Sequence, residues 1–185
     1  MDSRIKAVIF DLDGVICFTD KYHYQAWKAL SDRLGIYFDE TINNRLRGVS
    51  RMASLEIILE KSGRRYTEAE KAALAEEKNR TYQQLLARMT PGDLSDEVRD
   101  TLQALRHKGY PMAIGSSSKN TKFILERIGL STWFDAIADG TDITHSKPNP
   151  EVFLVAASKL NISPSLCAVV EGMPGQAFRP QKTVA

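Results

Sequence analysis

The chain has 185 residues, of which 43% are hydrophobic and 26% are charged, and its formal net charge at pH 7 is +2. This length suits a domain of ordinary size with an inserted subdomain. The small net charge gives no indication of nucleic-acid binding, and no apolar run approaches the roughly 20 residues that span a bilayer. Without a secretory signal, we expect a cytoplasmic protein whose two cysteines, Cys17 and Cys167, are reduced.

The first part of the chain predicts one buried strand followed only by helices. Residues 5–10 form a short apolar, β-branched run that is typical of a buried strand. Apolar residues at helical spacing predict a helix over 20–34, which Gly35 ends. Charged helical stretches continue to about residue 89, with a break at Gly63, and this part contains no convincing strand.

Beyond residue 91 the pattern changes to strands that alternate with helices. Such alternation predicts an α/β fold with a parallel, doubly wound sheet. We expect residues 1–15 and 92–171 to form this core, with residues 16–91 inserted as a helical cap. The expected helices cover residues 95–108, 120–128 and 150–160, and the expected strands cover residues 110–115, 134–139 and 167–171.

Polar side chains follow each expected strand of the core, at the edge of the sheet where ligands bind in such folds. Asp11 and Asp13 follow the first strand, and Ser116 begins a hydroxyl-rich turn after the second. Lys147 comes near the third strand, and Glu171 follows the last. The sequence therefore predicts that two acids, a hydroxyl-rich turn, a lysine and a third acid lie at one edge of the sheet.

These residue types point to phosphoryl transfer with a metal ion. Two close carboxylates repel unless a cation lies between them, and hard oxygen ligands beside a phosphate suit Mg²⁺. Asp11 can act as a nucleophile that becomes an aspartyl phosphate, while Asp13 exchanges a proton with the attacking or leaving hydroxyl. Ser116 and the amides around it favour phosphate oxygens, and Lys147 neutralises the charge on the transferred group.

Each of these residues has a simpler explanation when it is taken alone. Asp13-Gly14 is typical of a turn, Ser118 of a helix N-cap, and Lys147 of a solvated surface lysine. Turn chemistry does not readily account for all of them at successive strand ends. The combination favours a site for phosphate and a metal ion.

Three segments resemble the motifs of the haloacid dehalogenase superfamily. "VIFDLDGVI" resembles its first motif, "AIGSSS" its second and "SKPNPEVF" its third. The resemblance implies an α/β core with a cap and a monomeric enzyme. By this likeness Asp11 is the nucleophile, Asp13 is the general acid and base, and Mg²⁺ is the cofactor. The catalytic set implied is Asp11, Asp13, Ser116 and Lys147, and the metal ligands implied are Asp11, Asp13 and Glu171.

The cap segments "YHYQAWKAL" and "LRGVSRMASL" are similar to the beta-phosphoglucomutase branch of the superfamily. This likeness implies a phosphorylated sugar as substrate, with Arg51 on the phosphate that is not transferred and Lys78 on the sugar. Without the likeness, Trp27 is better explained as a core aromatic and Arg51 as an exposed residue at a helix start. The substrate contacts implied are His23, Trp27, Gly48, Ser50, Arg51, Ser54, Lys78, Ser116, Ser117, Ser118, Lys119 and Asn120.

The resemblance ends at Glu171. The superfamily carries a second acid, a metal ligand, where this chain has Gly172. Residues 172–185 show no pattern of the helix and further strand expected next. Read one base earlier with suitable codons, they give D-A-G-A-G-I-Q-A-A-K, which is the expected continuation. We therefore expect a frame-shifted, non-native tail that leaves residues 167–171 as an unpaired edge strand, with non-specific oligomers and impaired activity.

Three activities remain open at this point. The first is interconversion of beta-glucose 1-phosphate and glucose 6-phosphate through a bisphosphate. The second is hydrolysis of a sugar phosphate, in which water rather than a sugar hydroxyl attacks the aspartyl phosphate. The third is an inactive remnant that at most binds a phosphorylated sugar.

Overall fold

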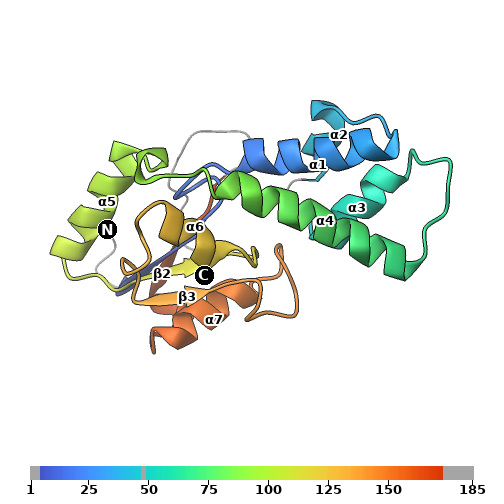
Figure 1. The fold of residues 1–185 in the computed structure, drawn as a ribbon. Coiled ribbons are helices and arrows are strands. Elements are labelled where there is room, and N and C mark those ends of the chain that lie inside the picture. The colour runs from blue at the N-terminus through green and yellow to red at the C-terminus, as the bar shows by residue number, and fades with distance from the viewer. Residues whose placement is uncertain (1–4, 47–48, 173–185) are drawn as a thin grey trace. The chain divides into compact units, whose positions relative to one another are not determined.

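The computed structural model describes residues 5–46 and 49–172, and these divide into two compact units (Figure 1). One unit contains the chain up to Phe18 and again from Met89, and the other is Thr19–Arg88. The helical unit thus begins at residue 19 rather than 16 and ends at 88 rather than 91. Residues 15–17 belong to the sheet-containing unit because their side chains are buried there.

The larger unit is an α/β core, as the alternating pattern predicts. All pairings in its sheet are parallel, and the strand order within the described residues is β3-β2-β1-β4. The strands are β1 (Ala7–Phe10), β2 (Met112–Gly115), β3 (Ala136–Ala138) and β4 (Cys167–Val170). The helices are η1 (Pro91–Asp93), α5 (Asp96–His107), α6 (Thr121–Arg127), α7 (Glu151–Lys159) and η2 (Pro164–Leu166).

Small side chains bring α7 close to one face of the sheet, with α6 on the other face in Figure 1. Successive strand residues point to opposite faces, so alternate positions of each strand line the same face. The resulting cluster joins strand residues and one side of α7. Its buried members are Ala7, Ile9, Ala113, Ala138, Val152, Ala156, Ala157 and Cys167.

The strand register determines which residues meet at the carboxyl edge of the sheet. Phe10 is level with Val170 of β4 and with Ile114 of β2. The backbone N–H of Asp11 donates to the carbonyl of Val170 at 2.9 Å, which continues the ladder by one bond. Asp11 and Glu171 therefore leave the sheet side by side.

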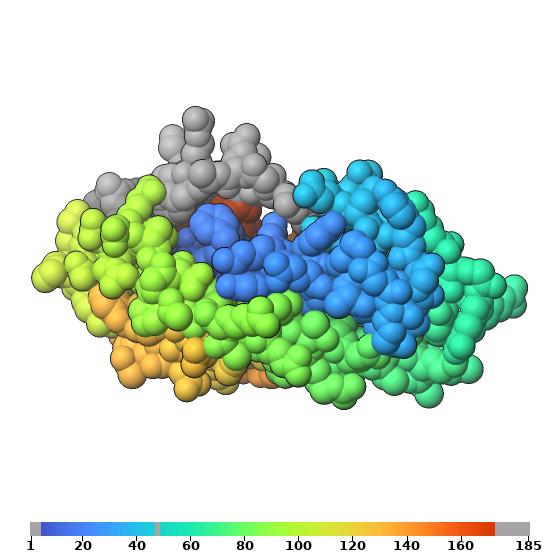
Figure 2. Space-filling view, turned by 45° about the horizontal axis from the view of Figure 1, so that its top comes forward, coloured from blue at the N-terminus to red at the C-terminus, as the bar shows by residue number. Residues whose placement is uncertain are grey.

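The smaller unit consists of helices throughout its described residues, as predicted. α1 (Asp20–Leu34) and α4 (Glu68–Leu86) lie side by side, which Figure 2 shows as adjoining blue and green surfaces. α2 (Glu40–Asn44) and α3 (Arg51–Leu59) complete the unit. Gly35 ends α1 with φ of 68°, a left-handed conformation that glycine adopts without strain. In the described part of the chain, no helix combines the length and apolar character needed to cross a bilayer.

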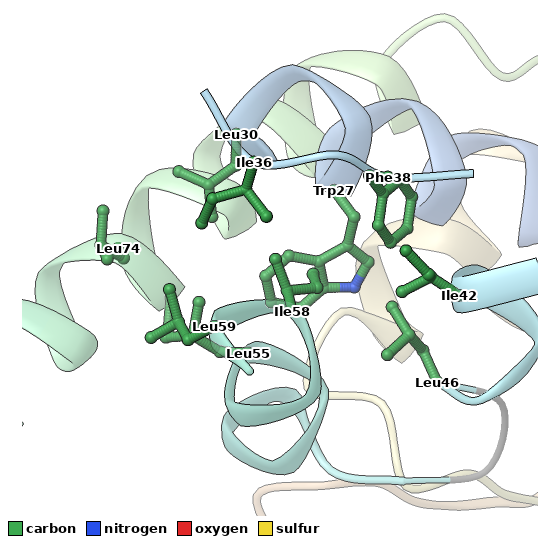
Figure 3. Packing of buried hydrophobic residues seen from close by; sticks show 11 residues of the cluster. Trp27, Leu30, Ile36, Phe38, Ile42, Leu46, Leu55, Ile58, Leu59 and Leu74 are labelled. Atoms are coloured by element: carbon green, nitrogen blue, oxygen red, sulfur yellow. The ribbon is translucent and has the colours of Figure 1, made fainter. Parts of the chain in front are cut away.

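One hydrophobic cluster holds this helical unit together (Figure 3). Trp27 lies at its centre and is 3% exposed. Burying an aromatic or large aliphatic side chain contributes about 1.5–3 kcal/mol to folding, so ten such residues are enough to define a separate core. The labelled members are Trp27, Leu30, Ile36, Phe38, Ile42, Leu46, Leu55, Ile58, Leu59 and Leu74.

Strand β4 lies at the edge of the sheet within the described residues. It pairs with β1 on one side, and its residues 168–170 are half-buried. An apolar edge strand offers unpaired backbone groups to another chain. This is the edge that the sequence predicts, whereas association of the chain through it stays a prediction.

Candidate active site

The sheet unit brings together one cation and two carboxylates at the ends of three different segments. Lys147 Nζ lies 2.8 Å from Asp11 Oδ1 and 3.4 Å from Glu171 Oε1. The side chains of Lys147 and Asp11 are 16% and 14% exposed, whereas that of Glu171 is 49% exposed. The structure thus places Asp11, Lys147 and Glu171 in one cluster, as their positions after successive strands predict.

The groups around Asp11 have opposite effects on the pKa of its carboxyl group. Burial raises the pKa of Asp11 above 3.8, Lys147 lowers it, and the charge of Glu171 raises it further. The N–H of Leu12 donates to Asp11 Oδ1 at 2.7 Å, which also favours the carboxylate. A buried carboxylate that depends on one ammonium for compensation gains from any further positive charge at the site.

The turn after β2 is fixed to the same cluster by hydrogen bonds. The N–H of Lys147 donates to Ser117 Oγ at 3.2 Å, which ties the lysine segment to this turn. Within the turn, the N–H of Ser118 donates to Ser116 Oγ and the N–H of Asn120 donates to Ser118 Oγ, each at 3.2 Å. Ser116 and Asn120 are buried, while Lys119 is exposed. The helix α6 begins at Thr121, so Asn120 rather than Ser118 is its N-cap residue.

Asp13 lies in the turn that leaves β1. The turn is closed by the N–H of Gly14, which donates to the carbonyl of Cys17 at 2.8 Å, and Gly14 has φ of 80°. Burial, followed by the charges of Asp13 and Asp11, raises the pKa of the Cys17 thiol well above 9.0. Cys17 is therefore an uncharged thiol packed beside the acidic turn.

The expected set of three metal-binding carboxylates, Asp11, Asp13 and Glu171, stays a prediction. Among the residues that the structure describes, no three acidic, histidine or cysteine side chains are arranged to hold a metal ion. Two carboxylates, Asp11 and Glu171, converge instead on the ammonium of Lys147. Mg²⁺ is commonly held by one or two carboxylates together with water and phosphate oxygens, so the donor chemistry fits this ion with two protein carboxylates.

Gly172 follows Glu171 and packs against the turn after β1. A β-carbon at residue 172 would lie 2.8 Å from the carbonyl oxygen of Gly14 and 3.4 Å from Val15 Cγ2. Contacts under 3.0 Å require the backbone to move. In this structure the absence of a side chain at residue 172 allows the end of β4 to approach the turn that carries Asp13.

The helical unit holds a second cationic cluster, centred on Lys78. Its Nζ lies 2.9 Å from His23 Nδ1 and faces the rings of Tyr82 and Trp27 at 4.5 and 4.8 Å. His23 stacks on Tyr82 with ring centroids 4.1 Å apart. Because an ammonium only donates, His23 Nδ1 accepts and the ring proton is on Nε2. Lys78 is 3% exposed, and aromatic faces together with a neutral histidine compensate its burial.

Arg51 lies at the start of α3 and is held by α4. Its Nη2 donates to Asn79 Oδ1 at 2.9 Å, and its side chain is 31% exposed. Ser50 is the N-cap of α3, since its Oγ accepts from the N–H of Ala53 at 3.2 Å. Ser54 is 4% exposed on the same helix. Gly48 lies outside the described residues.

The structure places Trp27 and Ser54 inside the helical unit rather than on its surface. Trp27 packs among aliphatic side chains, as expected for a core aromatic, and one face supports the Lys78 ammonium. Asn79 and Tyr82 belong to the same cluster and are absent from the residues expected from the sequence. Lys78 and Tyr82 are one helical turn apart on α4, and this spacing indicates from the sequence that their side chains are neighbours.

The His23–Lys78 contact predicts that the helical unit loses stability in mild acid. Burial, with the charges of Lys78 and Arg51, lowers the pKa of His23 well below 6.5. Only the unfolded chain binds a proton just below pH 6.5, so stability is fully present above this pH and falls as the pH drops towards the folded pKa. In urea titrations at pH 7.5 and 5.5, we expect wild type to lose about 1.4 kcal/mol more than His23→Gln between these two pH values, most of it below pH 6.5.

The control for this measurement is His107→Gln, which changes an exposed histidine of α5. This variant should follow wild type at every pH. Equal pH dependence in wild type and His23→Gln would contradict the assignment of a neutral, buried His23.

A parallel α/β core that carries an acid, a serine turn, a lysine and a second acid at its strand ends, with a helical insertion after β1, defines a class of phosphoryl-transfer proteins. The sequence pattern of the haloacid dehalogenase-like hydrolases matches residues 5–172. The chain therefore belongs to the haloacid dehalogenase-like hydrolase family, as its motifs predict.

Several known proteins are similar over most of the chain. A beta-phosphoglucomutase of Bacillus subtilis (strain 168) is 44% identical over 169 residues, which cover 90% of this chain and 75% of that protein. A fructose-1-phosphate phosphatase of Escherichia coli (strain K12) is 30% identical, with 92% and 88% covered. The crystal structure of a Clostridium difficile beta-phosphoglucomutase superposes with a TM-score of 0.83 at 41% identity, with 90% and 76% covered.

Proposed function

We propose that this chain is a beta-phosphoglucomutase-type enzyme that interconverts beta-glucose 1-phosphate and glucose 6-phosphate. The observation that carries the proposal is the contact of Asp11 with Lys147 beside Glu171, at the carboxyl edge of the sheet. The likeness to two beta-phosphoglucomutases above 40% identity supports the choice of reaction.

In the proposed mechanism, Asp11 is the nucleophile. A carboxylate oxygen of Asp11 forms a bond to phosphorus while the bond from phosphorus to the sugar oxygen breaks. Asp13 gives a proton to this leaving oxygen, and when a sugar hydroxyl attacks the aspartyl phosphate, Asp13 takes the proton of that hydroxyl. Lys147 neutralises the phosphoryl oxygens, and the turn from Ser116 orients them.

Asp11 starts the cycle carrying a phosphoryl group taken from a molecule of the bisphosphate. The free hydroxyl of beta-glucose 1-phosphate attacks this group first, and Asp11 takes the other phosphoryl group second, so a bisphosphate lies between the two steps. The sugar must then turn over, so the enzyme needs a cationic group for the phosphate that is not being transferred. We assign this group to Arg51, with Lys78 on the sugar. Both are held by neighbouring side chains before any ligand binds, which reduces the entropic cost of binding.

Mg²⁺ is the proposed cofactor, with Asp11 and Glu171 as its carboxylate ligands and Asp13 assigned by resemblance. When bound, the ion supplies positive charge that offsets the repulsion between the Asp11 carboxylate and a phosphate. Burial and the charge of Glu171 raise the pKa of Asp11, and a nearby positive charge acts in the opposite direction by favouring the carboxylate. We propose that the enzyme acts in the cytoplasm on a free sugar phosphate, without nucleic acid or a membrane as partner.

Hydrolysis of sugar phosphates is the second candidate, and the similarity to a fructose-1-phosphate phosphatase favours it. The two reactions share the aspartyl phosphate and differ in whether water or a sugar hydroxyl attacks it. Purified protein incubated with Mg²⁺, beta-glucose 1-phosphate and a trace of the 1,6-bisphosphate separates them. A mutase forms glucose 6-phosphate, a phosphatase releases inorganic phosphate, and neither product appears with an inactive chain.

The role of Arg51 predicts a loss that depends on the substrate. Arg51→Ala removes a charge-assisted contact worth about 1.5–3 kcal/mol, so KM for the bisphosphate should rise about tenfold to hundredfold. Hydrolysis of p-nitrophenyl phosphate, which has one phosphate, should change less than twofold by the same reasoning, within about 0.4 kcal/mol. Steady-state kinetics on both substrates measures the difference.

Arg45→Ala is the matched control, because Arg45 is an exposed arginine of the same unit that pairs with Glu60 at 2.8 Å. It should leave both substrates unaffected. Equal losses on the two substrates in Arg51→Ala would remove Arg51 from the binding of the second phosphate.

A further inference from the structure

The ring of Phe153 lies against the ammonium of Lys147. Lys147 Nζ lies 4.5 Å from the centroid of this ring, within the range of a cation–π contact. Phe153 is in the first turn of α7 and is half-buried against the cluster that joins α7 to the sheet. The same cation makes the ion pairs with Asp11 and Glu171, so the ring completes its surroundings.

The ammonium of Lys147 has little else to determine its position. It is buried, and its polar contacts among the described residues are the ion pairs with Asp11 at 2.8 Å and Glu171 at 3.4 Å. Ion pairs act over a wide range of directions and do not by themselves hold a flexible lysine in one place. A flat ring beneath the cation restricts it to the side of the ring where the carboxylates lie.

Gly115 provides the space that this ring occupies. A β-carbon at residue 115 would lie 2.7 Å from Phe153 Cδ1, closer than real β-carbons approach other atoms, and 3.1 Å from Cε1. It would also lie 3.3 Å from Ile9 Cγ2 on β1, so the added carbon would be confined between the Phe153 ring and Ile9. The aromatic ring is therefore seated on the backbone of β2, one residue before Ser116.

We propose that Phe153 is a positioning residue that acts through Lys147. Seated against Gly115, its ring face holds the Lys147 ammonium between Asp11 and Glu171. The consequence for phosphoryl transfer rests on the proposed function, whereas the position of the ammonium does not. The two are tested by separate measurements.

The position of the ammonium is measured by chemical labelling. Sulfo-N-hydroxysuccinimide acetate acetylates accessible lysine amines, and mass spectrometry of the Lys147 peptide gives the rate. Phe153→Leu keeps an apolar side chain but removes the ring face, and it should raise the rate about threefold to thirtyfold, the factor that corresponds to a cation–π contact. Phe153→Tyr keeps the ring and should react like wild type. Gly115→Ala should raise the rate in the same direction, because its methyl group displaces the ring.

Controls separate positioning from general loosening of α7. Val152→Ala removes buried volume from the neighbouring residue of the same helix, which is 0% exposed. It should lower the melting temperature and leave Lys147 labelling unchanged. Lys159, at the end of α7, is an internal reference, because its ammonium bonds the carbonyl of Ile137 and Asp142, each at 2.8 Å.

Two outcomes overturn the proposal. One is a Lys147 rate in folded Phe153→Leu equal to that of wild type, and the other is an equal rise in Val152→Ala. If Phe153→Leu fails to fold, Gly115→Ala is compared with Phe153→Tyr instead. Equal Lys147 labelling rates in these two variants would also overturn the proposal. If Phe153→Leu alters labelling while wild type turns over no sugar phosphate, the positioning role stands and the proposed function fails.

Discussion

Replacing Asp11 with Asn is expected to lower turnover by at least about a thousandfold, the scale seen when an enzymatic nucleophile is removed. The amide has the shape of the carboxylate but lacks the charged oxygen that forms the bond to phosphorus. It also leaves the Lys147 ammonium with Glu171 as its remaining carboxylate partner, at 3.4 Å. Release of phosphate from p-nitrophenyl phosphate and formation of glucose 6-phosphate both measure the loss.

Asp96→Asn is the matched control, since Asp96 is a 96% exposed carboxylate at the start of α5. It should retain wild-type rates. Mass spectrometry after incubation with acetyl phosphate adds a direct test, because wild type should gain one phosphoryl group on the Asp11 peptide and Asp11→Asn should gain none. Wild-type turnover by Asp11→Asn would end the assignment of Asp11 as nucleophile.

The sheet and its catalytic edge could be predicted because the signals are local. Each strand is a short apolar run that ends in one polar residue, and parallel strands bring their carboxyl ends to the same edge. Asp11 and Glu171 thus meet through register alone. The third partner, Lys147, follows no strand directly and reaches the edge from a connecting segment tied to Ser117. Lys147 is predicted at this edge from the motif that contains it, "SKPNPEVF", and not from the periodicity of the strands and helices.

The helical unit was harder to interpret because its cluster is assembled from distant segments. His23 and Lys78 are 55 residues apart in the chain, and Arg51 meets Asn79 across 28 residues. Neither pairing follows from helical spacing, which reports only on neighbours within one helix. The position of Trp27 illustrates the ambiguity. An aromatic at helical spacing is consistent with both a core and a binding surface, and packing determines that it lies in the core.

Neither the sequence motifs nor the geometry of the Asp11 cluster determines which acceptor receives the phosphoryl group. The Asp11 cluster supports transfer to water and transfer to a sugar hydroxyl equally well, since both reactions use the aspartyl phosphate. What separates them is which acceptor reaches the phosphoryl group, and this depends on residues that bind the sugar. Arg51 and Lys78 are therefore the residues whose variants are most informative about mutase against phosphatase activity.

Gly172→Asp is expected to raise Mg²⁺ affinity and Mg²⁺-dependent turnover by at least about tenfold, which corresponds to about 1.4 kcal/mol. The substitution adds a further carboxylate where β4 ends, next to Glu171 and against the turn that carries Asp13. Mg²⁺ prefers negatively charged oxygen ligands, and Asp11 and Glu171 already supply two carboxylates. Isothermal titration with MgCl₂ measures the affinity, and formation of glucose 6-phosphate measures the turnover.

The expected gain is opposed by a steric cost that two control variants separate from it. A β-carbon at residue 172 lies 2.8 Å from the Gly14 carbonyl oxygen, so every side chain at this position requires the end of β4 to move. Gly172→Ala carries this cost alone and should be less stable than wild type with no gain in affinity. Gly172→Asn has the shape of Asp without its charge and should bind Mg²⁺ more weakly than Gly172→Asp. If Asn and Asp variants bind equally, or if Asp binds no better than Gly, two carboxylates are sufficient for the ion and the interpretation of residue 172 as a lost metal ligand is wrong.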